Sequence, residues 1–352
     1  MSRGSKVRGS ARRESTNGNP ADLLSGGGPE MSDYCRRRPF EKGTAISQRS
    51  FVLSTLRRLH LEQPARFVHG IARRLARRTE VAATRARQGR RDAGLRRAYH
   101  RVLHGDIVFD RFGDAPRPEA LAIVVCLWNR PERLADVLRI IDAQRTSRSL
   151  RLVLWNNNPL DDEFYRSVIA SYRSEGSLTS IELHSSPINI GGMGRFVAMS
   201  ELVRHGYTGP FIMMDDDQNF DRDFVETLIA AWIPRSIAGV WAWNNSGDYW
   251  DRTQVVESGA SAMHVGTGGA ICDSAIVGRR TFFTRIPMRF LFMEDIWMSR
   301  LAQASGWRLT MVDAPVQFVL SELDQGHALF DYKESFYRWL KNPRHIPALL
   351  DG

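Results

Sequence analysis

Residues 211–217 read Phe211-Ile-Met-Met-Asp-Asp-Asp217, four apolar residues followed at once by three aspartates. The apolar part predicts a short strand that is buried on both faces, as in a parallel sheet. Three adjacent carboxylates repel one another, and a divalent cation would balance their charge. Mg²⁺ or Mn²⁺ bound through one or two carboxylates, with phosphate oxygens and water completing the shell, suits this pattern. A solvated turn that caps the next helix at Asp221 or Asp223 is the alternative.

A strand-then-helix order surrounds this stretch. Further strands are predicted at residues 121–128, 150–155 and 180–184, and helices from residue 131, at 193–205 and at about 223–232. Strands separated by helices imply an α/β fold, with a mostly parallel sheet and helices on both faces. Ligands of such sheets bind at the carboxyl ends of the strands, where the strand order switches. Asn156–Asn158 and Asp215–Asp217 both follow strands directly, so we expect a ligand site there.

A second acidic cluster lies farther along the chain, in Phe292-Met-Glu-Asp-Ile-Trp297. Glu294 and Asp295 stand at the start of a helix that is predicted to end at Gly306. A carboxylate at a helix N-terminus is stabilised as an anion, which suits a helix cap and equally suits a general base. The presence of the other cluster favours the base.

A glycine-rich turn precedes the helix at 193–205, in Asn189-Ile-Gly-Gly-Met-Gly-Arg195. Helix-entry turns of this kind bind phosphate through free N–H groups, and Arg195 is placed to contact a diphosphate. A tight turn without a ligand is the alternative.

Another turn, Gly266-Thr-Gly-Gly269, lies between the two acidic clusters. Glycines let a ligand approach the backbone closely, so Gly268 and Gly269 are candidates for ligand contact. Trp241, Trp243 and Trp250 follow the first cluster and are candidates for stacking on a ligand, with burial in the core as the alternative.

The composition indicates a folded protein without a membrane span. The chain has 352 residues, 43% of them hydrophobic, which suits one large domain or two modest ones. The longest apolar run, at 121–128, is far shorter than the ~18–20 residues that cross a bilayer. Cys35, Cys126 and Cys272 are scattered and provide neither a disulfide framework nor paired metal ligands. We expect a cytoplasmic protein, peripheral to a membrane at most, with an N-terminal transit peptide as the alternative.

The positive charge is concentrated near the N-terminus. Residues 1–104 hold 24 Lys and Arg against 8 Asp and Glu, whereas residues 105–352 hold 25 against 31. We expect a disordered basic leader at 1–50 and an Arg-rich helical extension and linker at 51–118. The helices of 51–104 fit an anionic membrane surface, packing on the acidic main domain, or nucleic acid, which the lack of interleaved aromatic residues disfavours. The main domain is predicted at 119–320 and a C-terminal helical segment at 321–352.

The ordered set of motifs resembles the GT-A glycosyltransferases, specifically the family 2 branch. Residues 125–132 resemble its first strand with Asn-Arg and Pro, residues 152–159 its second strand and polar turn, and residues 189–194 its Asn-Leu-Gly turn. Asp215-Asp-Asp217 matches its DxD metal motif, and Glu294-Asp295 its ED motif, which carries the catalytic base. The Asn-x-Gly-Gly-x-Gly turn with three aspartates also resembles the galactofuranosyltransferase subgroup. The resemblance covers about residues 119–315.

The resemblance implies a GT-A fold and inverting transfer of a sugar from a nucleotide-diphosphate donor, expected to be a UDP-sugar. The acceptor would be a hydroxyl of a glycan, glycolipid or other cell-surface polysaccharide precursor. Asp295, with Glu294, would be catalytic, and Asp217, Asp215 and His327 would bind Mn²⁺ or Mg²⁺. The donor contacts are expected among residues near the strand ends: Asn129, Arg130, Asn156, Asn157, Gly191, Gly192, Arg195, Asp215 and Asp216.

Two positions depart from the family pattern. Asn156 stands where the family usually has an aspartate that touches the nucleotide base. Residues 335–339 resemble the QxxRW motif of processive members, with Ser335 in place of glutamine, which argues against a polymer-extruding synthase. Two other functions stay open: a non-catalytic nucleotide-binding scaffold on a degraded transferase fold, and a metal-dependent nucleotidyltransferase.

Overall fold

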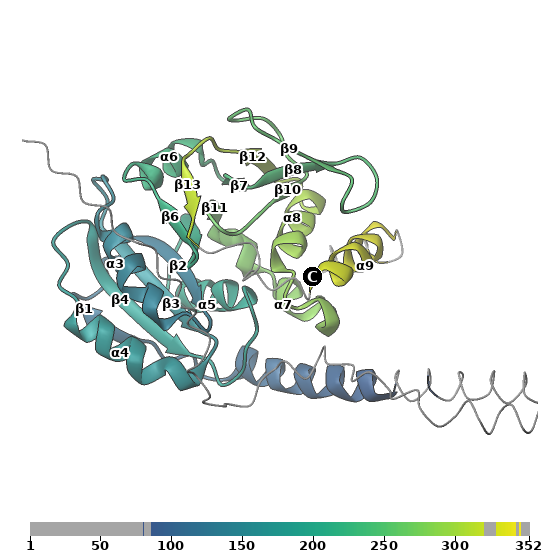
Figure 1. Cartoon of the computed structure of the whole chain (residues 1–352), viewed down its shortest axis with the longest axis horizontal. Helices are drawn as coiled ribbons and strands as arrows, with labels where there is room; N and C mark the ends of the chain where they lie inside the picture. The colour runs from purple at the N-terminus through teal and green to yellow at the C-terminus, as the bar shows by residue number, and fades with distance from the viewer. Residues whose placement is uncertain (1–79, 81–85, 320–328, 343–344, 346–352) are drawn as a thin grey trace, which may run out of the picture. The chain divides into compact units, whose positions relative to one another are not determined.

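The computed structural model describes residues 80, 86–319, 329–342 and 345, except for the side chains of residues 330 and 331. Its centre is an eight-stranded sheet (Figure 1). In spatial order the strands are β1 (Asp110–Gly113), β4 (Leu178–Ser185), β3 (Leu150–Asn156), β2 (Leu121–Leu127), β5 (Pro210–Asp215), β11 (Ala270–Asp273), β7 (Ser236–Gly239) and β12 (Arg308–Met311). Neighbouring strands from β4 to β5 are parallel, as are β7 and β12, whereas β1 and β11 run antiparallel to their neighbours. The predicted α/β class is confirmed.

Helices cover both faces of the sheet, as predicted. On one face lie α3 (Leu134–Asp142), preceded by a 3₁₀ turn at Pro131–Arg133, α4 (Asp162–Ser171) and α6 (Phe224–Ala231). On the other lie α5 (Met193–Arg204), α7 (Arg280–Thr284), α8 (Glu294–Ala304) and α9 (Phe330–Lys341). Short 3₁₀ turns occur at Pro159–Asp161, Ser274–Gly278 and Met288–Phe290.

Two small sheets flank the large one. The first contains β10 (His264–Val265), β8 (Ala242–Asn245) and β9 (Arg252–Gln254) in that order, and the second pairs β13 (Val316–Phe318) with β6 (Gln218–Phe220). The second sheet begins directly after the three aspartates, and the backbone N–H of Val319 donates to the carbonyl of Asp217 at 3.0 Å. The chain around this acidic turn is therefore held from both sides.

The central strand β2 explains why this sheet is buried on both faces. Ala122 and Val124 contribute to the hydrophobic cluster on the α5 face, while Leu121, Ile123 and Val125 contribute to the cluster on the α3 face. All five side chains are at most 2% exposed. Successive residues of a strand point to opposite faces, so an uninterrupted apolar run fits a strand covered on both sides.

The sequence also predicted where these elements begin and end. The four predicted strands match β2, β3, β4 and β5 to within two residues at each end. The predicted helices correspond to α3, α5, α6 and α8, and Gly206 and Gly306 follow α5 and α8 with positive φ values of 96° and 72°. Glycine adopts this backbone conformation without strain, which explains why the helices end there.

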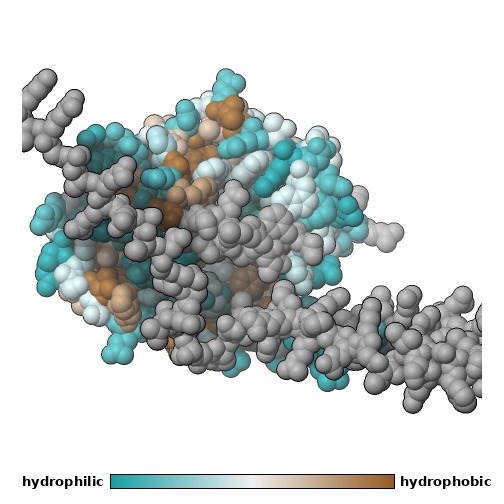
Figure 2. Space-filling view, in the orientation of Figure 1, coloured by the Kyte–Doolittle hydropathy of each residue, from teal (hydrophilic) through white to brown (hydrophobic). Residues whose placement is uncertain are grey.

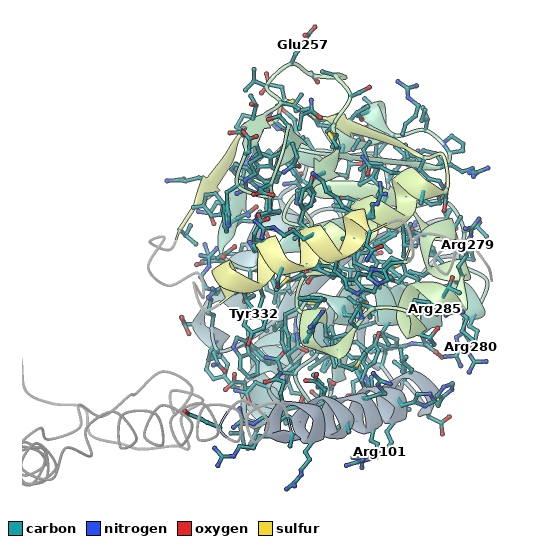
Figure 3. The ribbon with its side chains drawn as sticks, turned by 90° about the vertical axis from the view of Figure 1, so that its right-hand side faces the viewer. Arg101, Glu257, Arg279, Arg280, Arg285 and Tyr332 are labelled. Carbon is teal, nitrogen blue, oxygen red and sulfur yellow. The ribbon has the colours of Figure 1, made fainter. Side chains whose placement is uncertain are left out.

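The structured part of the chain begins before residue 119. Residues 86–104 form a helix whose Tyr99 and Val102 are buried in the cluster beside α5, and β1 extends the sheet. Arg101 on this helix points outward (Figure 3). The predictions for residues 1–50 and most of 51–85 lie outside the described residues.

The visible surface is mostly hydrophilic, with separate smaller hydrophobic areas (Figure 2). No helix among the described residues combines the length and the apolar character needed to cross a bilayer.

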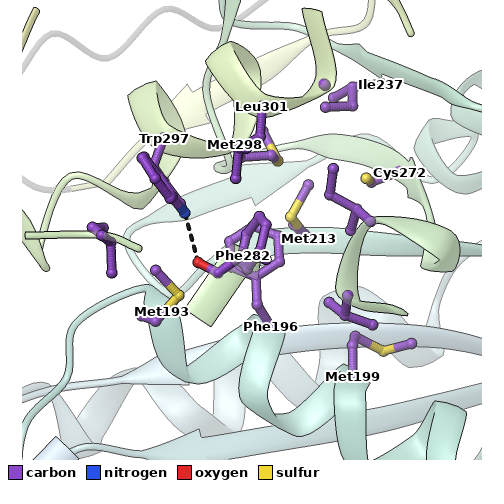
Figure 4. Packing of buried hydrophobic residues seen from close by; sticks show 14 of the residues in the cluster. Met193, Phe196, Met199, Met213, Ile237, Cys272, Phe282, Trp297, Met298 and Leu301 are labelled. Atoms are coloured by element: carbon purple, nitrogen blue, oxygen red, sulfur yellow. Dashed lines mark hydrogen bonds between the residues drawn. The ribbon is translucent and has the colours of Figure 1, made fainter. Parts of the chain in front are cut away.

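The core on the α5 face is rich in methionine and aromatic side chains (Figure 4). Trp297 of α8 is fully buried there, and its Nε1 donates to the carbonyl oxygen of Phe282 at 2.7 Å. This hydrogen bond satisfies the only polar atom of the indole ring and ties α8 to α7. The first turn of α8, which carries Glu294 and Asp295, is therefore anchored firmly beside the sheet.

Candidate functional site

The polar residues gather where the strand order switches. From β2 the chain continues to β3 and β4 on one side and then returns to β5 on the other. Asn156 at the end of β3 pairs in register with Leu127, and Asp215 at the end of β5 pairs with Cys126. The carboxyl ends of three neighbouring strands therefore meet at the predicted site.

The three aspartates are paired with arginines. Asp215 accepts a hydrogen bond from Nη2 of Arg195 at 2.8 Å. Nη1 of Arg130 lies 2.7 Å from Oδ1 of Asp216 and 3.4 Å from Oδ2 of Asp217. β5 ends at Asp215, and a turn follows that carries Asp216 and Asp217. Asp216 and Asp217 therefore share one arginine.

A further arginine at this turn was missed by the sequence analysis. Nε of Arg133 donates to the carbonyl oxygen of Asp216 at 3.0 Å, and its Nη2 donates to Oδ1 of Asn219 at 2.9 Å. Arg133 lies in the turn that follows Arg130 and Pro131, so the Asn-Arg-Pro motif offered a signal for it. The two arginines hold the acidic turn against the start of α3.

The buried carboxylates keep oxygens that are free to take a cation. Burial raises the pKa of Asp216 to about 7 despite Arg130, and burial with the charge of Asp215 raises the pKa of Asp217. Oδ2 of Asp216, Oδ1 of Asp217 and Oε1 of Gln218 are buried without a hydrogen-bond partner. Hard oxygens of this kind fit Mg²⁺ or Mn²⁺. The described residues contain no set of three or more His, Cys, Asp or Glu side chains arranged around one metal position, so protein ligands alone would not complete a shell.

Arg195 is a buried cation at the centre of the site. Besides Asp215, it donates to the carbonyl oxygens of Thr267 at 3.1 Å and Gly192 at 3.2 Å, and it is only 4% exposed. Burial alone would lower its pKa, but the charges of Asp215 and Glu294 outweigh burial and hold it above its ordinary value. All three of these hydrogen bonds are made within the chain, and the expected contact with a diphosphate stays a prediction.

The glycine-rich turn brings the second acidic cluster next to Arg195. A Cβ atom at Gly192 would overlap Oε1 of Glu294, and one at Gly191 would lie 2.6 Å from the ring of Phe292. Gly191 also has a φ of +60°, which glycine adopts without strain. The glycines at these positions thus permit a close approach to α8 as well as the tight turn.

Glu294 is buried between Arg195 and the Gly266–Gly269 turn. Its Oε1 lies 3.5 Å from Oγ1 of Thr267, which is within reach of a weak hydrogen bond. Burial raises the pKa of Glu294 to about 7; Arg195 opposes this shift and Asp295 adds to it. Asp215 and Glu294 therefore flank the same guanidinium, and the two acidic clusters converge.

Asp295 has different surroundings. Its Oδ1 accepts a hydrogen bond from the backbone N–H of Ile296 at 2.8 Å. Its Oδ2 lies 3.3 Å from Nε2 of His264, but the two groups are not aligned as in a hydrogen bond. Burial alone would raise the pKa of Asp295, but His264 and Lys333 outweigh it and hold the pKa well below the ordinary range. Its side chain remains 24% exposed. An ionised, reachable carboxylate can accept a proton.

His264 carries no motif that would have revealed it in the sequence. It lies in β10 and is 6% exposed, with its ring centroid 5.4 Å from that of Trp243 and 6.4 Å from that of Tyr249. Its partner Asp295 belongs to α8, so only the packing of β10 on α8 brings the pair together.

The predicted asparagines support the loops around the site. Asn156 is fully buried; its Oδ1 accepts from the N–H of Asn158 at 2.8 Å. Nδ2 of Asn157 donates to the carbonyl of Gly191 at 3.1 Å, which joins β3 to the glycine-rich turn. Asn129 has a φ of +53°, and its Oδ1 accepts from Nδ2 of Asn158 at 3.0 Å. The roles of Asn129, Asn156 and Asn157 in donor binding stay predictions.

The predicted acceptor residues lie on two flanks of the site. A Cβ at Gly268 would overlap the carboxylate of Asp215, and Gly269 donates its N–H to the carbonyl of Met213 at 2.9 Å. Trp243 lies beside His264, on the Asp295 flank. Trp241 instead packs against Phe318, with ring centroids 5.0 Å apart. His327 lies outside the described residues.

Comparison with known proteins gives structural likeness only. No family model matches the chain, and a search of curated proteins finds no match. The crystal structure of S. aureus TarS 1–349 matches with a TM-score of 0.38 and 15% identity, over 56% of this chain and 59% of that one. The mannosyltransferase PcManGT from Pyrobaculum calidifontis, in complex with GDP-Man and Mn²⁺, matches with a TM-score of 0.42 and 14% identity, over 76% and 78%. What this chain does has to be inferred from the side chains that meet at its sheet.

Proposed function

We propose that this chain is a nucleotide-sugar-dependent glycosyltransferase of the GT-A type, which transfers a sugar to an acceptor hydroxyl with inversion at the anomeric carbon. The proposal is carried by the approach of one residue from each acidic cluster, Asp215 and Glu294, to the buried guanidinium of Arg195. A single displacement requires the donor and the acceptor to be held side by side. Two acidic clusters that meet near Arg195 could hold one of them each.

On the donor side, Asp217 and Asp215 are the proposed metal ligands, supported by the unpartnered Oδ1 of Asp217. Bound Mn²⁺ or Mg²⁺ would stabilise negative charge on the departing diphosphate. Arg130, only partly exposed and 2.7 Å from Asp216, is proposed to contact the same diphosphate. His327 is retained as a proposed third ligand, and a UDP-sugar as the proposed donor.

On the acceptor side, Asp295 is the proposed general base. Asp295 is ionised at neutral pH, and its side chain is 24% exposed, so a hydroxyl can reach it. Asp295 would take the proton of that hydroxyl while the oxygen attacks the anomeric carbon, opposite to the departing diphosphate. Glu294, which is buried against Arg195 and Gly192, is proposed to hold these groups in position. The other proposed acceptor contacts are Trp241, Trp243, Gly268 and Gly269.

The decisive experiment measures release of nucleoside diphosphate from a panel of UDP- and GDP-sugars by the purified chain with Mn²⁺. Asp217→Asn and Asp295→Asn should each lower transfer by about 10²–10⁴-fold while the thermal unfolding curve is unchanged. Asp114→Asn, at an exposed position, is the matched control and should keep the full rate.

Two outcomes would contradict the proposal and favour its alternatives. Binding of UDP and Mn²⁺ without release from any donor would favour a non-catalytic scaffold. Release of pyrophosphate in place of a nucleoside diphosphate would favour a nucleotidyltransferase.

Attachment to an anionic membrane surface is part of the proposal for the Arg-rich segment 51–104. In its described part, Tyr99 and Val102 face the core while Arg97 and Arg101 are exposed. Arg280 of α7 lines the same cavity of about 430 Å³ as Leu103, and Figure 3 shows Arg101 on the same side of the molecule as Arg279, Arg280 and Arg285. Clustered arginines attract anionic lipid headgroups. Flotation with phosphatidylserine vesicles should fall when Arg97 and Arg101 are replaced by Gln, and unchanged flotation would refute the attachment.

A further inference from the structure

A small cavity lies next to the proposed general base. It has a volume of about 140 Å³ and is enclosed by residues of β8, β10, α8, α9 and the loop that contains Tyr249. Two of its wall residues, His264 and Ile296, are the ones that contact the carboxylate of Asp295. Asp295 does not itself line the cavity, so a group held there would lie near its carboxylate but separated from it by these two residues.

The lining of the cavity is basic and contains no acidic residue. Arg300 and Lys341 contribute the charges, and Asn245 and Gln303 contribute amide groups. A second cavity of about 530 Å³ shares Arg300 and Gln303 with the first, adds Arg308, and likewise contains no acidic residue. The two cavities together present positive charge around Arg300, which favours an anion.

Arg300 lacks a partner within the described part of the chain. It lies on α8 and is partly buried, yet it makes no hydrogen bond or ion pair with any described residue. Nearby cations behave differently: Arg338 pairs with Asp248 and Glu334, and Lys341 donates to the carbonyl of Gly247. A partly buried guanidinium without a partner loses hydrogen bonds to water that nothing replaces. An anionic ligand would replace them.

The remaining walls suit a ring. Tyr249 and Tyr337 contact each other edge to face, with centroids 6.0 Å apart, and the buried imidazole of His264 lines the same cavity. Aromatic surface with a few convergent polar groups is typical of a small-molecule site. The volume equals that of about five water molecules, so the cavity takes one compact group and not a chain.

α9 closes this cavity and holds its shape. Oε2 of Glu334 accepts from the N–H of Tyr249 at 2.7 Å, and Arg338 bridges Glu334 and Asp248 at 2.7 and 3.1 Å. The segment around Ser335, which the proposed reaction does not use, therefore fastens the Tyr249 loop to the cavity wall.

We propose that this cavity binds an anionic group, a phosphate or a carboxylate, carried by the acceptor, with Arg300 as the residue that selects it. The inference rests on the proposed function, because it assigns the acceptor side of the same site. An acceptor anchored by its anion at Arg300 and packed against the aromatic wall of the cavity would present a hydroxyl toward Asp295. The substrate class is accordingly a phosphorylated or acidic sugar and not a neutral one.

The test measures binding of glucose 6-phosphate, glucuronate, glucose and inorganic phosphate to the full chain by calorimetry. EDTA is present, so phosphate held through a metal at residues 215–217 does not contribute. Glucose 6-phosphate or glucuronate should bind at least about tenfold more tightly than glucose. Arg300→Gln should abolish this preference, Arg300→Lys should retain most of it, and Arg117→Gln, at an exposed position, should leave it unchanged.

Several results would overturn the inference. Equal binding of all sugars, or a preference that survives Arg300→Gln, would show that the residue does not select an anion. Inorganic phosphate binding as tightly as glucose 6-phosphate would mean a site for a free anion. Because the measurement needs neither donor nor turnover, these failures leave the transferase proposal standing, and the Asp295→Asn test decides that separately.

Discussion

Replacing Arg195 with methionine should destabilise the protein strongly. The variant keeps a long side chain in the core but removes the partner of Asp215 and the positive charge beside Glu294. It also leaves the carbonyl oxygens of Thr267 and Gly192 without their donor. Breaking a buried ion pair by removing one partner costs about 3–5 kcal/mol of unfolding free energy. Asp215 is 34% exposed, so water screens part of its charge and the loss should lie at the lower end of that range.

Denaturant unfolding at about pH 7 measures this loss. The control is Arg139→Met, since Arg139 is 68% exposed and pairs with Asp136 on the surface, where such pairs contribute about 0–1 kcal/mol. The loss in Arg195→Met should shrink on acidification, because protonation removes the uncompensated charge of Glu294, whose pKa burial raises to about 7. Adding Asp215→Asn to the variant should restore part of the stability.

Three results would refute this reasoning. A loss below about 1 kcal/mol would mean that the Arg195 pair is solvated like a surface pair. An equal loss in the control would remove the distinction on which the estimate depends. A loss that grows as the pH falls would show that the carboxylates are not the uncompensated groups.

Two further predictions follow from the same packing. Burial gives Glu294 a pKa of about 7 against an ordinary 4.5, so the folded state holds this proton more tightly than the unfolded state does. The stability of the wild type should therefore fall as the pH rises from about 4.5 to about 7. In thermal melts, the melting temperature of Glu294→Gln should therefore rise relative to that of the wild type between about pH 5 and pH 8. A difference in melting temperature that stays constant over this range would contradict the raised pKa. Gly194→Ala should cost about 1–3 kcal/mol, since its Cβ would overlap the buried ring of Trp155, whereas Gly278→Ala, with open space, should be nearly neutral in the same melts.

The strands and the position of the site were predictable from local patterns. An apolar run that ends in polar residues marks both where a buried strand lies and where it stops, as β5 with Asp215 illustrates. Parallel strands have their carboxyl ends at one edge, so Asn156 and Asp215 were expected near each other before their contacts were known. The first turn of α8 was predictable in the same way from its acidic residues and its terminal glycine.

The partners of these side chains were not predictable. Arg195 was expected to contact a diphosphate, which stays a prediction, but its hydrogen bonds to Asp215 and to two carbonyl oxygens were not expected. Arg133 and His264 were not identified at all, although they contact Asp216 and Asp295. Each contact joins segments that are distant along the chain, so a local motif such as Asn-Arg-Pro marks the residue without identifying its partner.

The amino-acid sequence was thus sufficient to predict the alternating strands and helices of this protein, the point where its strand order switches and the acidic residues near that point. These depend on backbone periodicity and on burial, which act over a few neighbouring residues. The charge balance of the site depended on folding, because pairing Arg195 with Asp215 and His264 with Asp295 requires β5, β10 and the helices to pack at short distances. Electrostatic partners are chosen by proximity in space, and proximity in space exists only once the core has formed.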